Sequence, residues 1–118
     1  MGSPVVHFEV MAKDRAKISD FYSKLFDWKM NLMPEMGYAM VDTGADGNGI
    51  GGGIGQDDEN WVTFYVEVSS AQAALDKAVS LGDKVVRPVV SIPGAVTMAV
   101  FSDPEGHVIG VVEPGTPS

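Results

Sequence analysis

The chain has 118 residues, of which 45% are hydrophobic and 20% are charged. This balance is typical of one soluble globular domain and excludes a disordered or membrane-spanning chain. The net charge of −8 argues against nucleic acid as a partner, because few basic side chains are available to neutralise phosphates. The absence of cysteine excludes disulfides, thiolate metal sites and cysteine nucleophiles. With neither a recognisable signal peptide nor a long apolar run, a cytoplasmic protein is expected.

The first half of the sequence predicts one strand, one helix and three more extended segments. Residues 5–10 (VVHFEV) alternate between apolar and polar side chains as a half-buried strand does. Asp14 is a predicted N-cap, and apolar residues then recur at helical spacing as far as Phe26. Extended segments are expected at about 28–33, 38–43 and 48–55, with glycine-containing turns before the last two.

The second half predicts the same order of elements again. Residues 61–68 alternate as a strand, Ser69 and Ser70 are cap signals, and 71–81 has helical periodicity. Gly82 is placed to end that helix. Strands at about 83–91, 95–102 and 107–113 complete the second copy.

A regular offset relates the two halves. A shift of 56 residues places Phe8 on Phe64 and Asp14 on Ser70. After a small insertion, a shift of 59 places the Ile50-Gly51 pair on Ile109-Gly110. Two βαβββ modules, at about 4–56 and 59–114, are too short to fold easily alone, so we expect one α+β domain over 4–118 with a shared sheet system.

Alternation assigns side chains to two faces of the sheet system. The apolar set should lie under the helices: Val6, Phe8, Val10, Phe64, Val66, Val68, Ile50 and Ile109. The opposite face should carry His7, Glu9, Met11, Thr63, Tyr65 and Glu67. Such a face is either a concave, partly wet cavity or an ordinary solvated sheet. Gly49, Gly51 and Gly53 leave one wall without side chains, either for a ligand or for close strand packing.

The segments VVHFEV, FYSKLFDW, GIGGGI and FSDPEGHVIG, in this order on a doubled βαβββ pattern, resemble the vicinal oxygen chelate superfamily. That group includes glyoxalase I, extradiol dioxygenases and bleomycin-resistance proteins, and this chain is most similar to the small glyoxalase-like branch related to lactoylglutathione lyase. The resemblance runs from Val5 to Glu113. It implies an incomplete, curved mixed-sheet barrel with a central cavity and the helices outside.

The resemblance also implies where a divalent metal would be held. Metal-dependent relatives use ligands from the first and last strand of each module, and these positions correspond to His7, Thr63, Gly51 and Gly110. Only His7 is a ligand type, whereas a dedicated divalent site needs three or four ligands. We therefore expect no metal cofactor.

Proton transfer is the chemistry that the remaining side chains favour. His7 can exchange protons near neutral pH, and Glu9 and Glu67 are further acid–base candidates on the same predicted face. The expected substrate-binding residues line the cavity: Tyr38, Met40, Gly51, Thr63, Tyr65, Met98, Gly110 and Val112. The alternatives are that His7 is a former ligand that now bonds a neighbour, that the glutamates are solvated, and that Tyr65 is a packing residue.

Two classes of function remain open. The first is a glyoxalase-like lyase or isomerase that acts on a small oxygenated metabolite by proton transfer, without the complete metal site. The second is a non-catalytic protein of bleomycin-resistance type that sequesters a cationic small molecule, which the acidic charge and the missing ligands would suit. The resemblance implies a homodimer in both cases.

Overall fold

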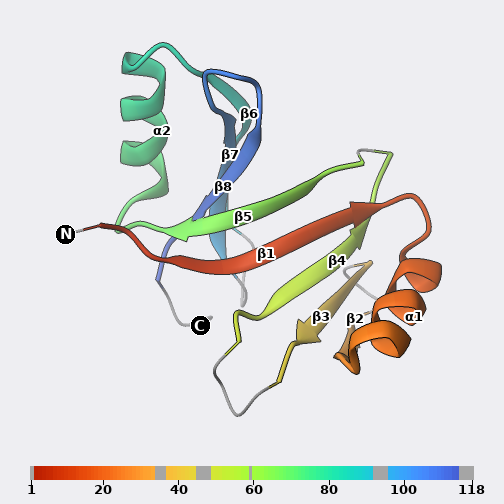
Figure 1. The fold of residues 1–118 in the computed structure, drawn as a ribbon. Helices are drawn as coiled ribbons and strands as arrows, with labels where there is room; N and C mark the ends of the chain where they lie inside the picture. Colours follow the sequence, from red (N-terminus) through yellow and green to blue (C-terminus); the bar gives the residue numbers. More distant parts are fainter. Residues whose placement is uncertain (1, 34–36, 45–48, 59, 92–95, 115–118) are drawn as a thin grey trace. The chain divides into compact units, whose positions relative to one another are not determined.

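The computed structural model describes residues 2–33, 37–44, 49–58, 60–91 and 96–114, which form two helices and eight strands (Figure 1). The elements follow one another as β1 (Val5–Ala12), α1 (Arg15–Phe26), β2 (Lys29–Met33), β3 (Tyr38–Asp42), β4 (Gly52–Gln56), β5 (Val62–Glu67), α2 (Ala71–Ser80), β6 (Lys84–Ser91), β7 (Thr97–Ser102) and β8 (Val108–Val112). The predicted α+β class and the doubled βαβββ order are confirmed. Neither helix is both long and apolar enough to cross a membrane, among the residues described.

The chain divides into two compact units, one formed by Val6–Thr63 and the other by the residues from Phe64 onward together with residues 2–5. We call them the first and the second module. The strand order in the first is β2-β3-β4-β1, and in the second it is β5-β8-β7-β6. In each module the first and last strands pair in parallel, β1 with β4 and β5 with β8, while the other pairs are antiparallel.

Helix α1 covers one face of the first module's sheet (Figure 1). It begins where predicted, because the Asp14 side chain accepts a hydrogen bond from the Lys17 backbone N–H at 3.1 Å. Beneath it lies a buried cluster of Ala39, Val41 and Ile54. Partly buried Phe8, Val10, Ile18, Tyr22, Trp28 and Met30 pack against the cluster. The predicted inward orientation of Phe8 and Val10 is thus confirmed, whereas Val6 is 36% exposed.

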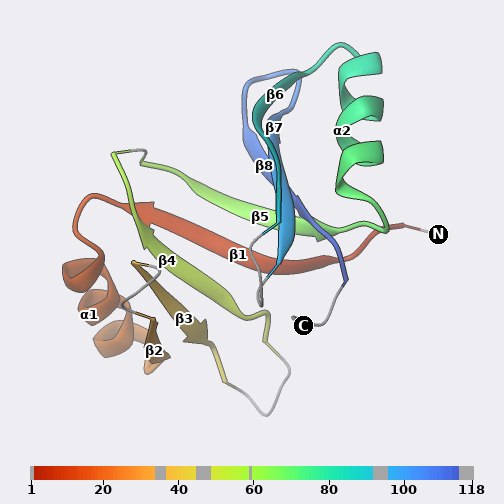
Figure 2. The same cartoon turned by 180° about the vertical axis from the view of Figure 1, so that it is seen from behind.

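Helix α2 covers the sheet of the second module in the same way (Figure 2). The Ser70 side chain caps it by accepting from the Ala73 N–H at 3.1 Å, and Gly82 follows its end with a φ of +97°. The buried cluster here is Ala71, Leu75, Ala99 and Val111, with Val66 and Val68 packed against it. Phe64 was also expected under the helix, but it lies outside this cluster and is 41% exposed.

Each module ties its helix to the end of its own last strand. The Arg15 N–H, at the start of α1, donates to Gln56 Oε1 at 3.2 Å. The Ala71 N–H, at the start of α2, donates to Glu113 Oε2 at 2.9 Å. The two helix starts are 56 residues apart and the two accepting side chains are 57 apart. The same hydrogen bond therefore occurs at equivalent positions in both modules.

The strand registers correct the predicted offset of 59 for the last strands. Glu9 pairs with Gly53 in the first module, and Tyr65 pairs with Gly110 in the second. Because Tyr65 stands 56 residues after Glu9, the equivalent of Gly110 is Gly53 and not Gly51. The offset is therefore 57, in agreement with the helix ties.

The expected orientation of Ile50 is also wrong. β4 begins at Gly52, later than the predicted 48–55 (of which Asn48 lies outside the described residues), and Ile50 precedes it with 48% of its surface exposed. Ile109 does face α2, since it pairs with Phe101, which packs against the α2 cluster.

Candidate functional site

The first module's sheet has an open face opposite α1, where the predicted ionisable residues lie. Phe8 and Val10 point to the helix, so His7, Glu9 and Met11 of β1 point away from it. β4 adds Gly53 and Gly55 to this face, because they pair with Glu9 and Met11. β3 adds Tyr38 and Met40, which pair with Gly55 and Gly53 respectively. The open face therefore carries two ionisable residues, one tyrosine and two methionines around a column of glycines.

The ring of Tyr38 fills the space above that glycine column. A Cβ atom added at Gly53 would coincide with the ring and hydroxyl of Tyr38, and one added at Gly55 would lie 2.8 Å from Met11 Sδ and 3.3 Å from Tyr38 Cδ1. Tyr38 pairs with Gly55 across the strands, but its ring leans diagonally over Gly53. At Gly53 the space is occupied by the Tyr38 ring, whereas an added Cβ at Gly51 meets only the Val41 carbonyl at an ordinary 3.5 Å.

This lean joins His7, Tyr38 and Glu9 into one hydrogen-bonded network. The Tyr38 hydroxyl donates to Glu9 Oε2 at 2.9 Å, and the same oxygen lies 3.1 Å from His7 Nε2. All three side chains are half-buried. Burial lowers the pKa of His7 below its ordinary value, because the charged imidazolium loses solvation. At neutral pH the imidazole is therefore mostly uncharged.

Gly51 and Thr63 are the remaining predicted residues of the first module. Gly51 stands directly before β4, and its carbonyl accepts a hydrogen bond from the Phe8 N–H at 3.2 Å, which places it beside His7 along β1. Thr63 is 5% exposed. Sequence reasoning proposed Tyr38 only as a cavity-lining residue and missed its contact with both ionisable residues.

The predicted residues of the second module share the face opposite α2. Tyr65 pairs with Gly110, and Glu67 and Met98 both pair with Val112. Here too a glycine makes room for a tyrosine ring, because a Cβ at Gly110 would collide with Tyr65. Tyr65 is only 4% exposed, so its ring is buried in the second module.

The family's divalent metal does not fit the residues present. A carboxylate at Gly53 or Gly110 would need the space that the Tyr38 and Tyr65 rings fill. Among the described residues, no group of three or more histidine, cysteine, aspartate or glutamate side chains is arranged to hold a metal ion. Of the four positions that the resemblance implies, only His7 has a side chain that could bind a metal. Its Nε2 atom is hydrogen-bonded to the Tyr38 hydroxyl.

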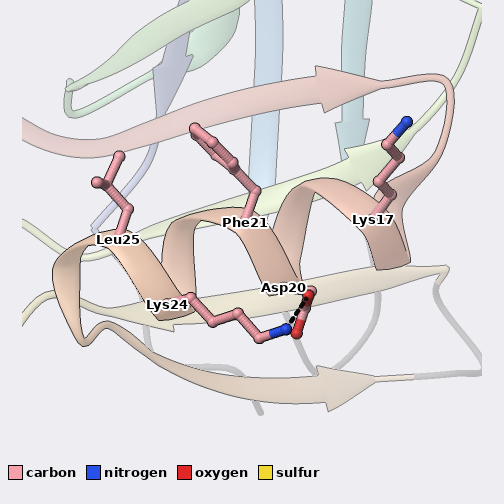
Figure 3. A pocket seen from close by; sticks show the side chains of 5 residues that line it. All are labelled: Lys17, Asp20, Phe21, Lys24 and Leu25. Carbon is pink, nitrogen blue, oxygen red and sulfur yellow. Dashed lines mark ion pairs between the residues drawn. The ribbon is translucent and has the colours of Figure 1, made fainter.

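A shallow hollow on the outer surface of α1 has a different character (Figure 3). Phe21 and Leu25 project on one side of the helix and are about half exposed, at 54% and 56%. On the other side, Lys24 pairs with Asp20 at 2.9 Å. All of its lining residues come from one helix and none belongs to the hydrogen-bonded network, so we assign it no chemistry.

The sequence was compared with models of known protein families and with curated proteins. A family model described as a glyoxalase-like domain matches residues 6–112. No curated protein sequence matches the chain.

Solved structures share the fold. A glyoxalase/bleomycin resistance protein/dioxygenase superfamily member from Vibrio splendidus 12B01 is 14% identical with a TM-score of 0.68, covering 95% of this chain and 99% of its own. Methylmalonyl-CoA epimerase from Mycobacterium tuberculosis is 14% identical with a TM-score of 0.64, covering 94% and 87%. The Mn(II)-bound glyoxalase from Novosphingobium aromaticivorans is 23% identical with a TM-score of 0.60, and the match covers 95% of this chain but 38% of that one. At these identities the likeness is one of fold.

Proposed function

Because this chain belongs to the glyoxalase-like family of the vicinal oxygen chelate superfamily, we propose that it is a lyase or isomerase that acts on a small oxygenated metabolite by proton transfer, without a resident metal. The observation that carries the proposal is the network of His7, Tyr38 and Glu9. This network places a base, a phenol and a carboxylate on one face of the sheet. On the same face, the side chains of Tyr38 and Met11 cover Gly53 and Gly55.

Each residue has a role that its chemistry supports. His7, neutral through its lowered pKa, removes a proton next to a substrate carbonyl. The Tyr38 hydroxyl is hydrogen-bonded to both other residues and so links the base to the carboxylate. Glu67, the third predicted acid–base residue, lies on the face of the second module opposite α2.

Methionine side chains indicate the character of the substrate's remaining part. Met11 and Met40 lie on the same face as the network, and Met40 is 38% exposed. Thioether side chains adapt to apolar or polarisable groups. We therefore propose a carbonyl compound with an apolar substituent. Two of the structural relatives, an epimerase and a glyoxalase, are compatible with such chemistry.

Proton exchange tests the enzyme proposal whatever product the reaction forms. The protein is incubated in deuterated water with a panel of 2-hydroxy and 2-oxo acids, aldehydes and thioesters, and loss of the proton next to the carbonyl is followed by NMR. Exchange should be enzyme-dependent and should fall by about 10²–10⁴-fold in His7→Ala. The matched control is His107→Ala, the chain's other histidine, which is exposed and paired with Asp103 at a turn. Equal loss in both variants would refute the role of His7.

A binding protein is the second candidate, and the acidity of the chain favours it. With a net charge of −8 and Glu9 on the open face, the site would attract a cationic small molecule. Calorimetry with a cationic glycopeptide should then show saturable binding that weakens in Glu9→Gln and at high salt. Saturable binding with no proton exchange on any panel member would favour this candidate over the enzyme. Sedimentation analysis would test the expected homodimer.

A further inference from the structure

We propose that His7, Tyr38 and Glu9 form a directional proton relay, in which His7 Nδ1 takes the substrate proton and Glu9 is the final acceptor. The inference rests on the proposed proton-transfer function and adds the direction and the atoms. It assigns Tyr38 a proton-carrying role that the family resemblance does not supply.

The direction follows from the fact that a phenol has one proton. A carboxylate is only an acceptor, so the hydrogen bond of 2.9 Å to Glu9 Oε2 must use the Tyr38 proton. The contact of 3.1 Å between the same oxygen and His7 Nε2 then needs a proton on Nε2. Since burial lowers the pKa of His7, the ring is neutral and carries that proton alone. Nδ1 is thus the basic nitrogen of His7.

The transfer conserves atoms and charge. A substrate C–H bond breaks, its proton forms an N–H bond at Nδ1, and the electron pair stays on the substrate as an enolate. The Nε2–H proton moves to the Tyr38 oxygen while the phenol proton moves to Glu9, which becomes a neutral carboxylic acid. His7 is left neutral in its other tautomer, and the reverse steps return a proton to the product.

The packing of Tyr38 holds the relay in line. Its ring rests over Gly53, where an added side chain would overlap it. In the second module, Tyr65 lies over Gly110, but it stands at the position equivalent to Glu9. The second module therefore has a tyrosine ring where the first module has the carboxylate that accepts the proton. The relay is therefore a property of the first module.

The two histidines allow a direct test of direction by nitrogen-15 NMR in mildly alkaline buffer. His7 should be the Nε2–H tautomer. His107 should be the Nδ1–H tautomer, because its Nδ1 lies 2.9 Å from Asp103 Oδ2, and it serves as the internal reference. In Tyr38→Phe the ring is kept and the hydroxyl removed, so His7 should become a mixture while His107 is unchanged. Finding His7 as Nδ1–H in the wild-type protein would overturn the proposal.

Kinetics with any exchanging compound test the same relay independently. Tyr38→Phe and Glu9→Gln should each reduce kcat by about 10²-fold or more with little change in KM. The double variant should be no slower than the worse single variant, because both interrupt one path. Losses that multiply would overturn the relay. If the tautomers are as stated and nothing exchanges, the proposed enzymatic function fails and the direction of the hydrogen bonds stands.

Discussion

At the scale of single residues, the position of Tyr38 depends on the missing side chain at Gly53. Gly53→Ala would place a methyl group inside the ring, so Tyr38 must leave His7 and Glu9. We expect the free energy of unfolding to fall by about 1–3 kcal/mol, as for other overpacked sites. Urea denaturation measures the loss.

Gly51→Ala is the matched control, since its added methyl group meets only ordinary contact at 3.5 Å. Adding Tyr38→Ala should remove most of the cost of Gly53→Ala, because the obstructing ring is gone. An equal cost of Gly53→Ala with and without the Tyr38 ring would contradict this explanation.

The lowered pKa of His7 makes stability depend on pH. The unfolded chain binds a proton at His7 near pH 6.5, whereas the folded protein binds it only at lower pH. Between these two pKa values the unfolded state holds more protons, so the free energy of unfolding decreases as pH falls below about 6.5. Denaturation of the wild type and of His7→Gln across this range measures the effect. The wild type should lose more stability on acidification, and parallel profiles would rule out His7 as the cause.

At the scale of elements, the tie between each helix and its last strand supports the start of the helix. Glu113→Ala leaves the first N–H of α2 without its acceptor and removes a carboxylate from the positive end of the helix dipole. A loss of about 1–2 kcal/mol in the free energy of unfolding is expected. Glu113→Gln is the control, because Gln56 accepts the equivalent hydrogen bond through an amide oxygen. It should retain most of the stability, and a loss as large as that of the alanine variant would assign the effect to charge.

Local signals made the helices predictable, but the offset of the last strands was not. Asp14 and Ser70 are cap residues by type and spacing, and both cap as expected. The repeated Ile-Gly pair suggested an offset of 59, whereas the registers give 57. A repeated residue pair does not determine the strand register, because the register depends on which face of the strand is buried. Ile54 and Val111, which the offset of 57 aligns, are the buried pair.

The candidate site was predictable only in part for a related reason. Strand alternation placed His7 and Glu9 on one face, because the period of two depends only on local geometry. The link through Tyr38 joins positions 29 and 31 residues apart and depends on a diagonal lean of one ring. That lean requires glycines on a neighbouring strand, and it becomes visible only once the register is known.

At the scale of the whole molecule, the filled glycine positions predict a protein that does not depend on a metal for stability. A site saturated a hundredfold above its dissociation constant would contribute about 2.7 kcal/mol, so removal of a resident ion would lower the melting temperature clearly. Because the Tyr38 and Tyr65 rings fill the space for the missing carboxylates, we expect EDTA to leave the melting temperature unchanged and elemental analysis to find no stoichiometric divalent ion. The variant for comparison is Gly53→Glu combined with Tyr38→Ala. It places a carboxylate on the same face as His7 and removes the ring that fills the space over residue 53. A stoichiometric ion in the wild type, with a melting temperature that falls in EDTA, would show that other ligands hold it and would contradict the proposed metal independence.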